Sequence, residues 1–293
     1  MKKIAFAGGV LIALAVANPS SGADLKAPLF KAPPPAPAFS WTGCYAGANA
    51  GWVGSHDQFN LAPSGNYLAV PFGGAPPNAA GGGAQPADLA AVTNSYTHDA
   101  SGGEIGPQVG CNWQAGRFVL GGEADIQWSS LNNTVGASYG TIPSVIGGFT
   151  IAPHTEHVSS KLEWFSTVRG RIGVPFDRVL LYATGGLAIG GVKSDTAVTF
   201  GTAGATGVYN LANQIGSMST TRFGWVVGAG GEYAFAPRWS VKAEYLYIDL
   251  GSFTYASPLV APAGVAPGYS WSTTVRERDQ VVRVGVNYRF GSM

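Results

Sequence analysis

The sequence predicts an all-β fold, an eight-stranded antiparallel up-and-down transmembrane β-barrel with long extracellular loops. Three observations support this prediction. Residues 282–290 alternate apolar side chains with polar or glycine residues, which is typical of a strand with two unlike faces. Similar stretches recur along the chain, joined alternately by short turns and long segments, as in barrels of the outer membrane. Only 11% of the residues are charged, against about a quarter in soluble domains, so much of the surface is expected to face lipid.

Composition excludes several other classes. After the N-terminus there is no run of about 18 apolar residues, so the sequence offers no spanning helix. A formal net charge of +1 gives no electrostatic basis for binding nucleic acid. Two cysteines are too few for a disulfide scaffold or a four-ligand zinc site.

The N-terminal segment is predicted to direct export. A basic start precedes an apolar run at residues 4–17, and small residues at 21–23 suit cleavage. Residues 1–23 are therefore predicted to be a signal peptide that is cleaved before Asp24. Residues 24–40 are predicted to be a proline-rich periplasmic tether, because proline cannot donate to a sheet ladder. Residues 41–290 are predicted to be the barrel, located in the bacterial outer membrane.

Alternation defines the expected strands. The first begins at Trp41, and the others cover residues 104–113, 118–128, 162–174, 179–192, 222–235, 239–247 and 282–290. Long loops are expected at about 55–102, at 129–159, between 192 and 222, and up to about 271, on the extracellular side. Apolar side chains are expected to face lipid. Both faces of residues 179–192 are apolar, so the faces of that strand are not assigned.

Aromatic residues are expected to form girdles near the strand ends, where membrane meets water. The residues assigned to them are Trp41, Trp113, Trp128, Trp164, Trp239, Tyr288 and Phe290.

Charged side chains recur on the inward faces of the expected strands. They are Glu123, Asp125, Arg169, Arg171, Glu232, Lys242, Glu244 and Arg283. Side chains just fill an eight-stranded barrel, so we expect Arg169 or Arg171 to pair with Glu123 or Glu244. Because an unpaired buried charge is costly, this pattern favours a closed lumen. A narrow gated pore remains the alternative, if the pairs exchange partners.

Cys44 and Cys111 are predicted to form a disulfide. They fall at similar heights on sequential antiparallel strands and on the same, lipid-facing side. Export places them in an oxidising compartment, where such a bond persists. Two separate buried thiols are the alternative.

Two motifs were weighed for chemistry. Residues 136–140 fit the G-x-S-x-G pattern of a hydrolase elbow, but that motif needs a preceding strand and a following helix, and a loop is expected here. His154 and His157, with a glutamate between them, could bind a metal, but a solvated loop is the preferred interpretation. The sequence therefore predicts no catalytic residues, no cofactor and no metal site.

Several motifs resemble one protein family. They are Trp41-Thr-Gly-Cys-Tyr45, Gly110-Cys-Asn-Trp-Gln114, Thr167-Val-Arg-Gly-Arg-Ile-Gly173, Tyr182-Ala-Thr-Gly-Gly-Leu187 and Lys242-Ala-Glu-Tyr-Leu-Tyr247. Together they are similar to the small outer-membrane β-barrel proteins of alphaproteobacteria, surface antigens of the opacity-protein and OmpA-like barrel class. The C-terminal residues Arg283, Gly285, Tyr288 and Phe290 resemble the signal read by the barrel-assembly machinery, although three residues follow Phe290.

The resemblance implies a non-enzymatic protein that contributes to envelope integrity and to cell-surface interaction. Its expected partners are outer-membrane lipid, lipopolysaccharide and the barrel-assembly machinery, with no nucleic acid. One alternative is a small porin for passive diffusion of solutes. Another is a surface receptor that binds haem or a host ligand through its loops, with His154 and His157 as iron ligands.

Overall fold

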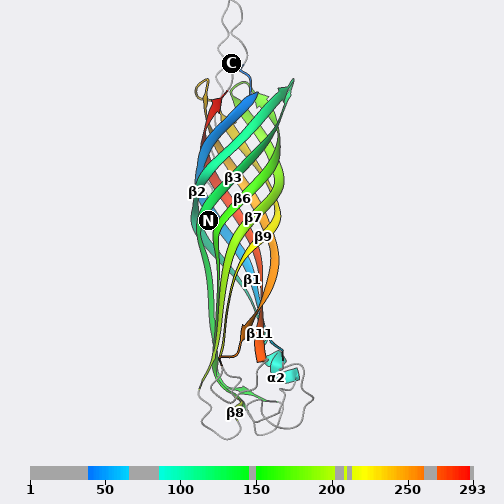
Figure 1. The fold of residues 1–293 in the computed structure, drawn as a ribbon, viewed down its shortest axis with the longest axis vertical. Coiled ribbons are helices and arrows are strands. Elements are labelled where there is room, and N and C mark those ends of the chain that lie inside the picture. The colour runs from blue at the N-terminus through cyan, green and yellow to red at the C-terminus, as the bar shows by residue number, and fades with distance from the viewer. Residues whose placement is uncertain are drawn as a thin grey trace, which may run out of the picture. The chain divides into compact units, whose positions relative to one another are not determined.

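A computed structural model describes residues 39–65, 86–144, 150–201, 208–209, 213–260 and 269–290. The expected signal peptide, residues 1–23, and most of the tether, residues 24–38, lie outside the described residues. Eight antiparallel strands close into a barrel in the order β1-β11-β10-β9-β7-β6-β3-β2 (Figure 1). The predicted fold class is confirmed.

The barrel strands are β1 (Gly43–Gly65), β2 (Asn94–Ala115), β3 (Phe118–Tyr139), β6 (His154–Phe176), β7 (Val179–Phe200), β9 (Gln214–Tyr233), β10 (Trp239–Pro258) and β11 (Tyr269–Phe290). The short strands β4 (Ile142–Pro143), β5 (Thr150–Ile151) and β8 (Val208–Tyr209) form a separate small sheet. A one-and-a-half-turn helix, α2 (Pro86–Ala91), lies between β1 and β2. Among the described residues, no helix is long and apolar enough to cross a membrane.

Short turns join the strands at one end of the barrel. Two of them use left-handed backbone, at Gly116 (φ 59°) and Asp177 (φ 53°). The connections at the other end are long, and they carry α2 and β8 (Figure 1). The alternation of short and long connections is as the sequence predicted.

The part of each strand next to the short turns has the apolar outer face expected for contact with lipid. Exposed apolar side chains run from the turns to a ring that includes Trp52, Trp128 and Trp225. The ten residue-to-residue steps from Phe118 to Trp128, at a rise of ~3.3 Å each and a tilt of ~40°, span ~25 Å, the height of a barrel's apolar band. We call this part the lipid band.

The structure settles two face assignments within the lipid band. On β7, Leu181 and Leu187 face outward, whereas Leu180 and Tyr182 are buried in the lumen. Trp41 was predicted to lie in an aromatic girdle, and this prediction was wrong. It is fully buried, and its indole N–H donates to the backbone oxygen of Asp177 at 3.1 Å.

The strands are much longer than the sequence analysis predicted, at 20–23 residues each. Large parts of the predicted loops 55–102 and 129–159 are strand, because β1 continues to Gly65, β2 starts at Asn94, β3 continues to Tyr139 and β6 starts at His154. We call the part of the strands beyond the ring of Trp52, Trp128 and Trp225 the extension.

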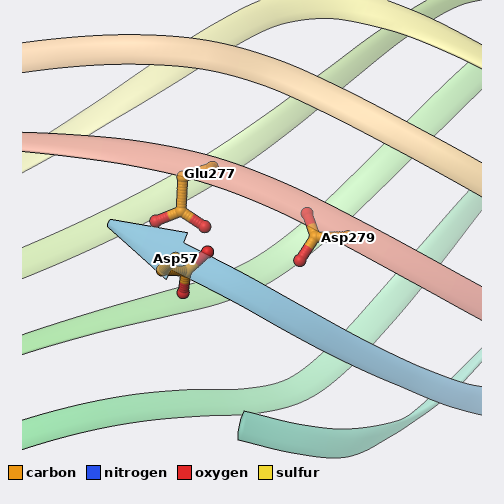
Figure 2. Close-up of side chains that lie close together, drawn as sticks. All are labelled: Asp57, Glu277 and Asp279. Carbon is orange, nitrogen blue, oxygen red and sulfur yellow. The ribbon is translucent and has the colours of Figure 1, made fainter. Parts of the chain in front are cut away.

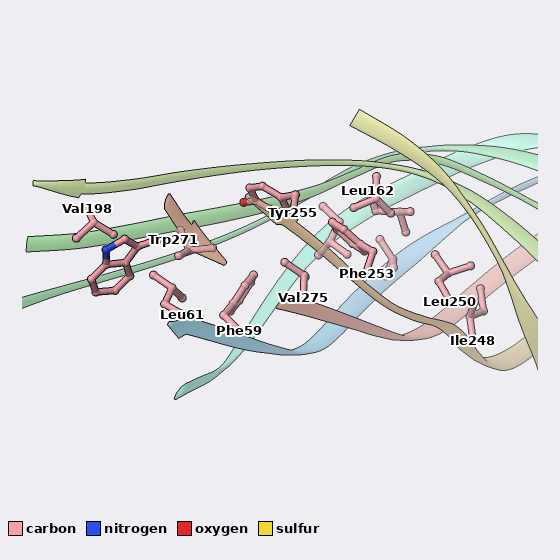
Figure 3. Close-up of a cluster of buried hydrophobic side chains, with 14 of the residues drawn as sticks. Phe59, Leu61, Leu162, Val198, Ile248, Leu250, Phe253, Tyr255, Trp271 and Val275 are labelled. Atoms are coloured by element: carbon pink, nitrogen blue, oxygen red, sulfur yellow. The ribbon is translucent and has the colours of Figure 1, made fainter. Parts of the chain in front are cut away.

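In the extension the two faces exchange character. Outward side chains are mostly polar, and most inward ones form an apolar core that includes Phe59, Leu162, Val198, Trp271 and Val275 (Figure 3). Irregular pairing between Leu162 and Trp164 of β6 and between Asp249 and Gly251 of β10 accompanies the change. A barrel that faces water must turn its apolar side inward. The sequence analysis expects strands with their apolar side toward lipid, so it predicts loops in this part of the chain.

Candidate functional site

The candidate site is the barrel lumen, because most of the chemically active side chains gather there. Within the lipid band, β3, β6, β9, β10 and β11 bring together all the inward charges that the sequence singled out. These are the acids Glu123, Asp125, Glu232 and Glu244 and the bases Arg169, Arg171, Lys242 and Arg283, all of them buried. We call this set the charged plug.

Arg169 lies at the centre of the charged plug. Its guanidinium contacts Glu244 at 2.8 Å and Asp125 at 2.9 Å, and it also pairs with Glu123. Arg283 of β11 contacts the same Asp125 and Glu244, both at 2.8 Å. Arg169 and Arg283 therefore share two carboxylates, which joins the pairs into one network.

The remaining charges extend this network toward the short turns. Lys242 lies 2.7 Å from Glu123, and Arg171 lies 2.8 Å from Glu232. The hydroxyl of Tyr45 donates to Glu123 at 2.5 Å. Gly110 leaves room for that tyrosine, since a Cβ there would lie 2.4 Å from its hydroxyl. Each acid of the charged plug has a basic partner, so the buried charges compensate one another.

The two cysteines are bonded to each other. Cys44 of β1 and Cys111 of β2 are opposite residues in the strand register and lie on the outer face, with an S–S distance of 2.07 Å. The bond joins the first two strands close to the short turns.

The two motifs weighed for chemistry lie in strands rather than loops. Residues 136–139 belong to β3, so the G-x-S-x-G stretch is not a strand-to-helix elbow. His154 and His157 lie on opposite faces of β6. His154 is buried between the rings of Tyr139 and Phe200, with centroids at 4.8 and 4.9 Å, whereas His157 is exposed. The solvated-loop interpretation was therefore wrong, and the two imidazoles do not converge on one ligand.

The C-terminal residues that resemble an assembly signal complete β11. Arg283 belongs to the charged plug, and a Cβ on Gly285 would lie 2.3 Å from Asn49 Oδ1. Tyr288 packs edge-on against Trp239 and against Phe290, with centroids at 5.0 and 5.2 Å. Their role in assembly stays a prediction.

The sequence analysis missed a second titratable group in the lumen. Asp57 of β1 and Glu277 and Asp279 of β11 are buried in the extension, and one carboxylate oxygen of each lies within 4.8 Å of the others (Figure 2). We call these residues the acidic trio. Burial, followed by the Asp57 charge, raises the pKa of Glu277 to about 8. Burial likewise raises the pKa of Asp57 to about 6, and burial together with the Glu277 charge raises the pKa of Asp279.

The acidic trio was missed because Asp57 fell in a predicted loop and the other two preceded the predicted closing strand. One signal was available. Glu277, Asp279, Val281 and Arg283 follow one another at period two, so both acids belong to the inward face of β11.

Comparison with known proteins agrees with this architecture. Residues 25–290 match the outer membrane protein beta-barrel domain. The chain belongs to this family.

Relatives in the family include the 31 kDa outer-membrane immunogenic protein of Brucella melitensis. It is 32% identical over 287 residues, which cover 95% of this chain and 97% of the relative. The 22 kDa outer membrane protein of Rhizobium leguminosarum is 31% identical over 50% of this chain and 52% of its own. Among solved structures, the outer membrane protease OmpT of Escherichia coli is similar with a TM-score of 0.47 and 10% identity, over 87% of this chain and 99% of its own.

Proposed function

We propose that this protein is a non-enzymatic, closed barrel that contributes to envelope integrity and to interactions at the cell surface. The observation that carries the proposal is the filling of the lumen. The charged plug occupies the lipid band, and the apolar core occupies the extension beyond it. Such a barrel is a rigid membrane anchor that presents its long connections to the outside.

The filled lumen argues against the alternative of a general-diffusion porin. A solute would first have to displace the paired side chains around Arg169, each of which would then lose a buried partner. It would then have to cross the apolar core of the extension, where a polar solute would lose its hydration among buried apolar side chains.

The structure argues against the iron ligands expected for a haem receptor, His154 and His157. Because His154 is buried between two rings and His157 points outward, they do not bind one iron from the same side. A host ligand bound through the long connections remains within the proposal. The Brucella relative is named an immunogenic protein, which supports exposure at the cell surface.

Export and assembly complete the proposal. Residues 1–23 direct export and are cleaved. The barrel-assembly machinery reads the C-terminal part of β11, which ends at Phe290. The exposed apolar side chains of the lipid band then contact membrane lipid and lipopolysaccharide.

Conductance in planar bilayers tests the closed barrel. The reconstituted mature chain is expected to give no stable conductance steps, while a porin inserted at the same protein-to-lipid ratio serves as the positive control. Large, stable steps from the mature chain would contradict the proposal. A haem titration of the same sample, repeated with His154→Ala and His157→Ala, addresses the receptor alternative. Stoichiometric binding lost in both variants would favour the receptor.

A further inference from the structure

The acidic trio lies inside the apolar core and apart from the charged plug. Along β1, Asp57 lies between the inward-facing Ser55 and Phe59, and along β11 the two acids lie between Val275 and Val281. Asp57, Glu277 and Asp279 are each 1% exposed or less. Three carboxylates are thus held together where neither water nor the charged plug reaches them.

The acidic trio lacks the compensation that the charged plug has. Among the described residues, the nearest arginines along β11, Arg276 and Arg278, instead approach Asp249, at 3.6 and 3.5 Å. In the described part of the chain, no ion pair involves a member of the acidic trio. Burying several carboxylates together without a counter-charge is strongly unfavourable, and a bound cation would supply the missing counter-charge.

The hydrogen bonds of the acidic trio leave oxygens free to act as ligands. Asn133 Nδ2 donates to Asp57 Oδ2 at 2.8 Å, the Ser55 hydroxyl and the Arg278 backbone also hydrogen-bond the Asp57 carboxylate, and Ser160 donates to Glu277. Within the described part of the chain, Asp57 Oδ1 and both oxygens of Asp279 have no hydrogen-bond partner. The fully buried Asp279 carboxylate therefore faces the other two acids with its whole coordinating capacity unused (Figure 2).

We propose that Asp57, Glu277 and Asp279 bind a divalent cation of the Ca²⁺ type. All the donor atoms in the cluster are oxygens, which suit hard cations, and there is no sulfur or imidazole among them to favour zinc or copper. Ca²⁺ accepts irregular sets of carboxylate oxygens at ~2.3–2.6 Å, and extracellular sites bind it with dissociation constants of ~10⁻⁴–10⁻³ M. Small movements of these side chains bring the three oxygens into that range.

The cation would act as a clamp on the barrel. Asp57 belongs to β1 and the other two acids to β11, the first and last strands, whose pairing closes the ring. A cation shared between them cross-links residues about 220 positions apart in the chain, as the numbers 57 and 277 show. Removing it leaves three mutually repelling carboxylates at the closing seam and loosens the extension before the lipid band.

Equilibrium binding and thermal unfolding test the proposal on the full mature chain. The chain is folded from urea into zwitterionic micelles in the presence of either CaCl₂ or EDTA. Equilibrium dialysis against Ca²⁺ is expected to give about one bound ion per chain, and unfolding followed by tryptophan fluorescence is expected to move to higher temperature in Ca²⁺ than in EDTA. Asp279→Asn keeps the shape of the side chain but removes its charge, and it should weaken Ca²⁺ binding at least tenfold and abolish the Ca²⁺-dependent shift.

A control variant and a replacement variant accompany Asp279→Asn. Asp195→Asn removes an exposed acid from the outer face of β7 and should bind Ca²⁺ as the unaltered chain does. If Asp279→Asn does not fold, Glu277→Gln takes its place. Unaltered Ca²⁺ binding in the trio variants, or identical unfolding in Ca²⁺ and EDTA, would overturn the proposal. So would unfolding that depends on pH but not on Ca²⁺, because protons rather than a cation would then neutralise the acidic trio.

Discussion

Replacing Arg169 by methionine is the sharpest test of the charged plug. Methionine keeps much of the volume of the side chain but removes the charge that contacts Glu123, Asp125 and Glu244. The plug then holds four acids and three bases, all buried. Leaving one partner of a buried pair uncompensated typically costs about 3–5 kcal/mol, so we expect the free energy of unfolding to fall by about that amount.

A second substitution identifies the cause of the loss. Adding Glu244→Gln to Arg169→Met restores the balance to three acids and three bases, so the double variant should regain part of the lost stability. The coupling energy between the two positions is expected to lie at about 1–3 kcal/mol. Arg117→Met, in the exposed turn between β2 and β3, is the control and should cost about 0.5 kcal/mol or less.

Reversible urea unfolding of the barrel in lipid vesicles, followed by tryptophan fluorescence, measures each free energy. If Arg169→Met costs no more than Arg117→Met, the paired network does not stabilise the barrel. If the energies of Arg169→Met and Glu244→Gln simply add, the two side chains do not interact as the 2.8 Å contact requires.

Three further predictions follow from the same geometry. Val284→Arg places a charge on the outer face of the lipid band and should cost about 2–4 kcal/mol in a liposome folding assay, whereas Val284→Leu should be mild; equal effects would contradict the face assignment. Thiol labelling of the denatured, unreduced protein should detect no free thiol, since Cys44 and Cys111 are bonded, and two reactive thiols per chain would disprove the pairing in solution. Phe59→Ala should lower the free energy of unfolding by about 3–5 kcal/mol because the ring is fully buried in the extension, and an equal loss in the outward-facing Asn60→Ala would argue against an inward core.

The lipid band could be predicted from the sequence almost residue by residue. There the outer solvent is lipid, so a single rule, apolar side chains outward, assigned both faces of β2, β3 and β11 correctly. The same rule placed Glu123, Arg169 and Arg283 in the lumen, where they are buried. The rule did not assign the faces of β7, because residues such as Leu180 and Tyr182 make its inner face apolar as well.

The extension could not be predicted by that rule, because its outer solvent is water. The inward residues of β1 there, Asp57, Phe59 and Leu61, alternate with Gln58 and Asn60 as regularly as residues in the lipid band do. A rule that expects strands with their apolar side toward lipid gives no account of a strand that faces water, so residues from about 55 onward are predicted to be loop. The register changes at Leu162–Trp164 of β6 and Asp249–Gly251 of β10 also shift the inward set by one residue, which breaks the alternation in the sequence.

The change from an apolar outer face in the lipid band to a polar outer face in the extension also decides which buried charges in the lumen find partners within the chain. In the lipid band, lipid excludes charge from the outside, so polar side chains collect inside and must compensate one another, as those around Arg169 do. In the extension, water accepts the polar side chains outside, and the interior becomes a dry core around Phe59 and Trp271. A charge left in such a core needs a partner that the core itself does not supply. The charged plug has its partners within the chain, whereas the acidic trio, at the β1–β11 seam of the dry core, requires one from outside.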